Sequence, residues 1–147
     1  MKTIQHFVGG KIFSGESKRV GKVFNPATGE QSAEVKLATT KDVNDAVANA
    51  KKAFSSWSNK PPLQRARVMF KFKDLIEKNS DELTKIIVSE HGKVYEDAKG
   101  SLTRGLEVVE YACGIPQMLK GEFTENVGSD VDSWSIRQPL GVCAGVT

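Results

Sequence analysis

The sequence has few cysteines, no long apolar run and little net charge. Cys113 and Cys143 are too few and too isolated for a disulfide framework or a metal site, so we expect reduced, buried thiols. No run approaches the roughly 18 apolar residues that span a bilayer. The opening residues resemble neither a secretory signal nor a transit peptide. We therefore expect a cytoplasmic protein with no metal ion and no membrane partner.

An excess of charge of one sign is also missing. The 21 basic and 18 acidic residues leave a formal charge of +3, too small and too evenly spread for a nucleic-acid footprint. Nucleic acid is therefore not an expected partner. The hydrophobic share of 39% and the charged share of 27% are close to those of soluble globular proteins, so the chain is expected to pack.

Turn residues divide the first part of the chain into short strands. Gly9 and Gly10 form a typical hairpin turn, because glycine readily adopts a positive φ. Pro26 and Gly29 suit a second tight turn, where one position needs a fixed φ and another a permissive residue. The strands expected around these turns are residues 4–8, 11–14, 20–24 and 31–37.

Four helices are expected next. Thr39 and Asp42 have the spacing of a capping box, and apolar residues then recur every three or four positions up to Trp57. Pro61 and Pro62 break this helix and suit the start of the next, while Gly92 is a typical helix end. The four helices are expected to begin at Thr39, near Pro62, at Asn79 or Ser80, and near Val94, and the last should end at Cys113.

The pattern changes again after Pro116. Residues 122–127 and 131–137 alternate in polarity around a Gly-Ser-Asp turn and predict a second hairpin. Residues 139–147 are almost continuously apolar, as is typical of a strand buried on both faces of a parallel sheet. Such a strand needs neighbours that are reached through crossover helices. We therefore expect the chain to be a fragment of a longer α/β protein.

The candidate binding residue is Arg104, which lies between two helical glycines. Gly100 and Gly105 each cost the helix about 1 kcal/mol relative to alanine, and close approach of another element or of a ligand would offset that cost. The planar guanidinium of Arg104 suits a carboxylate ligand. A salt bridge with Glu107 or plain packing is the alternative, and the residues alone favour it. Neither histidine has a plausible catalytic partner nearby in the sequence.

Three sequence motifs resemble those of a known family. They are Asn-Pro-Ala-Thr-Gly-Glu at 25–30, Ala-Phe-Ser-Ser-Trp at 53–57 and Glu-His-Gly-Lys at 90–93. In this order they resemble the amino-terminal region of the aldehyde dehydrogenase superfamily. Residues 138–147 resemble the first strand of that family's NAD-binding domain.

The resemblance covers essentially the whole chain and is closest to the methylmalonate-semialdehyde branch. Residues 97–116 carry most of this finer similarity. Ser101 and Leu102 depart from it, since the family more often has Glu-Val there. By motif, Arg104 matches the arginine that binds the substrate carboxylate, and Thr147 matches a position whose backbone contacts the cofactor. No catalytic residue is expected within this chain.

The resemblance implies an NAD-dependent, coenzyme A-acylating oxidoreductase. It would convert malonate semialdehyde or methylmalonate semialdehyde to acetyl-CoA or propionyl-CoA with loss of the carboxyl group. The expected cysteine nucleophile and oxyanion hole would lie beyond Thr147, so this fragment should be inactive alone. The partners would be a small-molecule aldehyde, coenzyme A and further copies of the enzyme, in a dimer or tetramer.

The implied fold class is α/β, aldehyde dehydrogenase-like. Residues 1–121 would form the amino-terminal part of the NAD-binding domain, 122–138 an oligomerisation hairpin, and 139–147 the first strand of the Rossmann-type core. Two alternatives remain. An NAD(P)-dependent enzyme that forms a free acid would be expected to lack the Thr-Arg-Gly motif at 103–105, and a non-catalytic interaction module would be expected to end in a capped, polar terminus.

Overall fold

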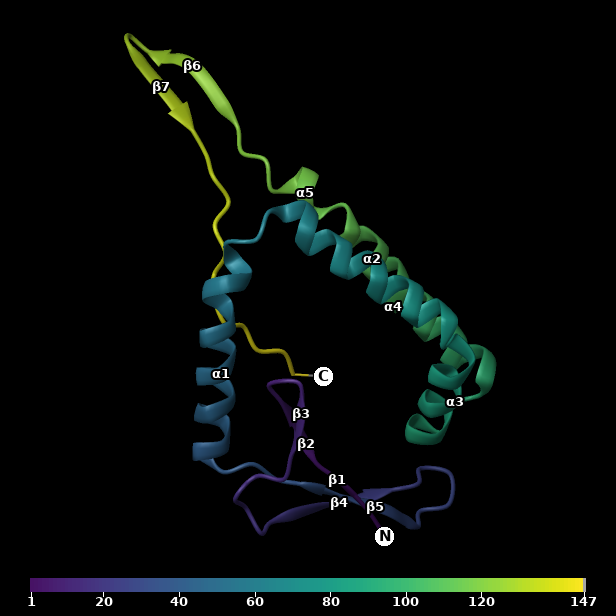
Figure 1. Ribbon diagram of the computed structural model, residues 1–147. Helices are drawn as coiled ribbons and strands as arrows, with labels where there is room; N and C mark the ends of the chain where they lie inside the picture. Colours follow the sequence, from purple (N-terminus) through teal and green to yellow (C-terminus); the bar gives the residue numbers. More distant parts are fainter. Residues whose placement is uncertain (147) are drawn as a thin grey trace.

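The computed structural model describes residues 1–146 and joins a base of short strands to a helical body and a projecting hairpin (Figure 1). The strands of the base are β1 (Lys2–Ile4), β2 (His6–Val8), β3 (Lys11–Phe13), β4 (Val20–Phe24) and β5 (Gln31–Lys36). β2 and β3 form the predicted hairpin, with Gly9 at φ 60° and Gly10 at φ 79° in its turn. β5 lies in the middle of a separate sheet, antiparallel to β4 and parallel to β1. Both predicted turns are confirmed.

The helices are α1 (Thr40–Ser58), α2 (Pro62–Lys78), α3 (Ser80–His91), α4 (Tyr95–Cys113) and the short α5 (Ile115–Met118). The four predicted helices are therefore confirmed. The capping box of α1 is present, because the Thr39 hydroxyl accepts the backbone N–H of Asp42 at 3.1 Å and the Asp42 carboxylate accepts the backbone N–H of Thr39 at 2.8 Å. Gly92, at φ 78°, ends α3 in the left-handed conformation. No helix in the described part of the chain is both long and apolar enough to cross a membrane.

The core lies where α2, α3 and α4 pack together, and small residues occupy it. Ala98 of α4 is fully buried, and Ala66 of α2 and Cys113 of α4 are buried as well. Thr84 of α3 is 1% exposed, and its hydroxyl donates to the Ser80 carbonyl at 2.7 Å, so this buried polar group is satisfied. Side chains of this size let helix backbones approach closely. The predicted burial of Cys113 is confirmed.

The apolar stripe of α1 faces the last part of the chain rather than this core. Val43, Val47 and Trp57 remain exposed. Ala50, Phe54 and Trp57 line an open pocket together with Gly141, Val142 and Cys143. In Figure 1 the final segment runs back past α1 toward the strands of the base. The predicted stripe therefore exists, but residues 1–146 cover it only in part.

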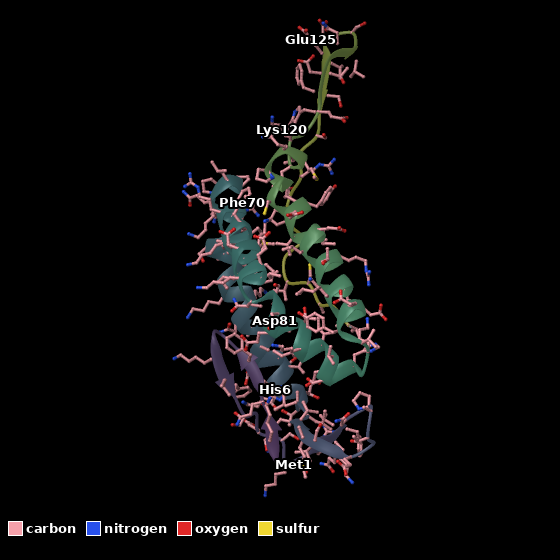
Figure 2. The ribbon with its side chains drawn as sticks, turned by 90° about the vertical axis from the view of Figure 1, so that its right-hand side faces the viewer. Met1, His6, Phe70, Asp81, Lys120 and Glu125 are labelled. Atoms are coloured by element: carbon pink, nitrogen blue, oxygen red, sulfur yellow. The ribbon has the colours of Figure 1, made fainter. Side chains whose placement is uncertain are left out.

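A hairpin of β6 (Phe123–Gly128) and β7 (Val131–Trp134) projects from the helical body. Every residue of both strands is exposed, and Phe123 pairs with Trp134. In Figure 2 Glu125 of this hairpin lies at the opposite end of the molecule from Met1. The second predicted hairpin is thus confirmed, although β7 ends three residues earlier than the sequence suggests.

The prediction of a buried strand over residues 139–147 is wrong for the residues described. Residues 139–146 form neither strand nor helix, and Leu140 is 95% exposed. Cys143 is exposed as well, which corrects its predicted burial. A strand needs partners for its backbone N–H and C=O groups, and no strand of the described chain pairs with this segment.

Candidate functional site

Arg104 lies on the exposed side of α4, whose other side packs against α2 and α3. One Nη of its guanidinium donates to the Ser101 hydroxyl at 3.1 Å. The other Nη lies 3.6 Å from the position that a Cβ would take at Gly100. Apart from the adjacent residues and the backbone of α4 itself, no described atom lies within 4 Å of the corresponding position at Gly105. A Cβ at Gly100 would therefore be in ordinary van der Waals contact with the guanidinium, and no close approach within the described residues requires glycine at position 100 or 105.

The alternative pairing of Arg104 with Glu107 is not present. Side chains on a helix lean toward its amino terminus, and Arg104 accordingly reaches back to Ser101 rather than forward to Glu107. Within residues 1–146, Arg104 makes no ion pair with a carboxylate. Its charge is therefore not committed to a partner in the described chain.

A second cation reaches the same hydroxyl from the turn between α3 and α4. Lys93 follows the left-handed Gly92, and its Nζ donates to the Ser101 hydroxyl at 2.9 Å. The Ser101 hydroxyl donates its own hydrogen to the backbone carbonyl of Asp97 at 3.1 Å. Lys93 also lacks an ion pair within the described residues. Lys93, Ser101 and Arg104 thus form a cluster in which two cations converge on a neutral group.

Sequence reasoning did not single out Lys93 and Ser101 as functional residues. The available signal was the spacing of Ser101 and Arg104, since residues three apart on a helix are neighbours. Lys93 precedes the helix, so helical periodicity gave no indication of its position. The departure from Glu at position 101 was a further signal, because a neutral residue there leaves both cations without a carboxylate.

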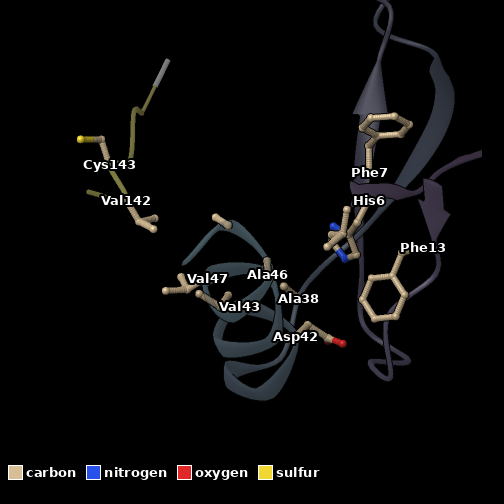
Figure 3. Close-up of a pocket in the computed structure, with 12 residues that line it drawn as sticks. His6, Phe7, Phe13, Ala38, Asp42, Val43, Ala46, Val47, Val142 and Cys143 are labelled. Carbon is tan, nitrogen blue, oxygen red and sulfur yellow. The ribbon is translucent and has the colours of Figure 1, made fainter. Parts of the chain in front are cut away.

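A second candidate site is a pocket of about 410 Å³ between β2, β3 and α1 (Figure 3). Asp42 lies in its wall and is 4% exposed. Hydrogen bonds from the Thr39 backbone and hydroxyl hold the pKa of Asp42 below its ordinary value. The carboxylate also accepts the backbone N–H of Glu16 at 3.1 Å. These bonds join the loop after β3 to the start of α1, so Asp42 has a structural role.

His6 lines the same pocket, but it does not form a catalytic pair with Asp42. Its ring lies 6.2 Å from that of Phe13, centroid to centroid, and its Nε2 has no hydrogen-bond partner among the described residues. In the described part of the chain, the hydrogen bonds that Asp42 accepts come from Thr39 and Glu16. His6 therefore lies in the same pocket as Asp42, but the two side chains do not form a hydrogen-bonded acid–base pair.

The remaining predicted site position is Thr147, which lies outside the described residues. No group of three or more His, Cys, Asp or Glu residues within 1–146 is placed to hold a metal ion. Residues 139–146, which precede Thr147, form neither strand nor helix. Of the predicted contacts, only Arg104 has a described geometry.

Comparison with known proteins identifies the class of this chain. The model of the aldehyde dehydrogenase family matches residues 12–147. The chain therefore belongs to the aldehyde dehydrogenase family, and the predicted resemblance and fold class are confirmed. Several individual relatives in this family have names that also state a substrate.

The chain is 47% identical over 147 residues to the malonate-semialdehyde dehydrogenase of Pseudomonas aeruginosa, covering 100% of this chain and 29% of that protein. It is 46% identical over 143 residues to the acylating, mitochondrial methylmalonate-semialdehyde dehydrogenase of Arabidopsis thaliana, covering 97% of this chain and 24% of that protein. A crystal structure from Sinorhizobium meliloti 1021, assigned as a methylmalonate-semialdehyde dehydrogenase and complexed with NAD, is 48% identical with a TM-score of 0.90, covering 96% of this chain and 29% of that one. The chain thus spans less than a third of each of these proteins.

Proposed function

We propose that this chain forms the amino-terminal part of an NAD-dependent oxidoreductase that acts on malonate semialdehyde or methylmalonate semialdehyde. The products would be acetyl-CoA or propionyl-CoA, formed with loss of the substrate carboxyl group and transfer of the acyl group to coenzyme A. The names of the relatives support this substrate class, and the acylating relative from Arabidopsis supports coenzyme A as the acceptor. NAD, which the Sinorhizobium structure contains, would accept the hydride from the substrate aldehyde.

Arg104 would bind the substrate carboxylate, and this assignment carries the proposal. Its guanidinium is exposed and has no carboxylate partner in the described chain. It also keeps free N–H donors, since the one side-chain hydrogen bond it makes within residues 1–146 is to Ser101. A forked donor of this kind matches the two oxygens of a carboxylate. A simple aldehyde such as propionaldehyde lacks that carboxylate and would not use Arg104.

The three predicted regions fit the same proposal. Residues 1–121 would belong to the NAD-binding domain, and residues 139–147 would complete their strand only beside neighbouring strands of that domain. The hairpin at 122–138 would join subunits of a homo-oligomer, either a dimer or a tetramer. Its full exposure supports this role, because unpaired strand edges readily accept strands from another chain.

The test compares two substrates in the full-length enzyme that carries this chain. Arg104→Ala should lower kcat/KM for malonate semialdehyde by roughly ten- to a hundredfold more than for propionaldehyde, the expected loss of a charge-assisted pair. Arg104→Lys should restore part of the difference, since an ammonium keeps the charge but not the fork. Arg67→Ala, at another exposed arginine on α2, serves as the matched control. Equal losses on both substrates for Arg104→Ala would remove the binding role.

A further inference from the structure

The Ser101 hydroxyl uses all of its hydrogen-bonding capacity in the cluster of Lys93, Ser101 and Arg104. A serine hydroxyl has one hydrogen to donate and two lone pairs to accept with. The hydrogen goes to the Asp97 carbonyl at 3.1 Å. The lone pairs accept Lys93 Nζ at 2.9 Å and an Arg104 Nη at 3.1 Å. Because the helix backbone fixes the hydroxyl hydrogen, both lone pairs are directed at the cations.

This arrangement restricts Arg104 without neutralising it. A free arginine side chain loses rotamer entropy when a ligand immobilises it. The bond to Ser101 fixes the guanidinium before any ligand arrives and uses one of its five N–H groups. A carboxylate in place of the hydroxyl would also hold Arg104, but it would compete with an anionic ligand for the same donors.

Lys93 brings a second positive charge to the same point. It is half-buried, and the left-handed Gly92 before it directs the chain into α4. Neither Lys93 nor Arg104 is paired with a carboxylate within residues 1–146. Two cations that share one neutral acceptor repel each other, and an anion bound between them would relieve this repulsion. The cluster therefore favours an anionic ligand over a neutral one.

From this geometry we propose that Ser101 and Lys93 complete the substrate-carboxylate site. Ser101 is a positioning residue that orients Arg104, and Lys93 supplies the second cation of the site. The ligand class is a short aldehyde that bears a carboxylate. This inference rests on the proposed function of Arg104.

The experiment uses the full-length enzyme that carries this chain and the ratio of kcat/KM for malonate semialdehyde to that for propionaldehyde. Ser101→Ala should lower this ratio roughly three- to tenfold, as expected when a hydrogen bond of ordinary net strength no longer positions Arg104. Ser101→Thr keeps the hydroxyl and should restore the ratio. Lys93→Met should lower the ratio as well. The control is Thr103→Ala, because the Thr103 hydroxyl donates to the Lys99 carbonyl at 3.0 Å and accepts from neither cation.

A second measurement repeats Ser101→Ala in an Arg104→Ala background. If Ser101 acts through Arg104, the second substitution should leave the ratio unchanged, since coupled residues are not additive. Additive losses would overturn the positioning role, and so would an unchanged ratio in Ser101→Ala when Arg104→Ala still lowers it. Both of these results would leave the proposed function intact. An unchanged ratio in Lys93→Met would overturn the role of the second cation. Equal losses on both substrates in Arg104→Ala would overturn the inference and the proposed function together.

Discussion

The described fold exposes far more surface than a compact protein of its mass. Its accessible surface is 11623 Å² for a chain of 16.1 kDa. The scaling of surface with mass gives roughly 7,400 Å² for a folded monomer of this size. The excess of about 4,200 Å² equals the area that about five standard interfaces bury on one partner. Exposed apolar side chains supply part of it, including Val47 at 47% and Trp57 at 42%.

We therefore predict that residues 1–147 alone self-associate in solution and bind a hydrophobic dye. The perturbation is Val47→Lys, which places a charge in the apolar stripe of α1 and should reduce both the mean mass and the dye fluorescence. Ala48→Lys adds the same charge to the same helix, about 100° around it, and should change neither measurement. Light scattering after size exclusion gives the mass, to be compared with the 16.1 kDa of one chain.

Two results would refute this reasoning. A monomer at high concentration that binds no dye would mean that the apolar faces of α1 and of the final segment cover each other in solution. Equal effects of Val47→Lys and Ala48→Lys would mean that net charge, rather than the stripe, controls association. Either result would mean that the excess apolar surface does not drive self-association.

Two further predictions concern the cap of α1 and the hairpin. Because hydrogen bonds lower the pKa of Asp42 below its ordinary 3.8, this carboxylate contributes stability above that pH, and the contribution is lost as pH falls through the lower folded pKa. Asp42→Asn should therefore flatten the acid limb of a chemical-denaturation series, and an unchanged limb would count against the cap. Ser133→Pro should reduce the oligomer mass of the full-length enzyme relative to Ser133→Ala, because Ser133 pairs with Thr124 in the hairpin. An unchanged mass would exclude the hairpin from the subunit contact.

Local signals in the sequence predicted most of the secondary structure. The capping box at Thr39, the proline at position 62 and the left-handed Gly92 act within one helical turn, and each marks a helix end in the structure. The strand expected at residues 139–147 depends instead on neighbours distant in the sequence. Apolar composition shows that such a segment can form a buried strand beside other strands. It does not show whether those neighbouring strands are present.

The Arg104 site was only partly predictable for a related reason. The sequence offered Glu107 as a partner because opposite charges three residues apart on a helix commonly pair. The direction of helical side chains instead favours a partner on the preceding turn, and Ser101 lies there. Lys93 reaches the cluster through the turn after Gly92, and no helical spacing describes that path. The residue types were visible in the sequence, whereas their convergence depends on the turn geometry.

The packing of α4 explains how an exposed arginine can hold a defined position. Ala98 is fully buried against the neighbouring helices, and Cys113 anchors the far end of the same helix. Ser101 and Arg104 lie between these two anchors, on a helix that packs against α2, α3 and α5. A site on a packed helix keeps its geometry better than one on a loop. The core of small residues thus fixes the place of Arg104 on α4, and within residues 1–146 no carboxylate pairs with Arg104 or Lys93.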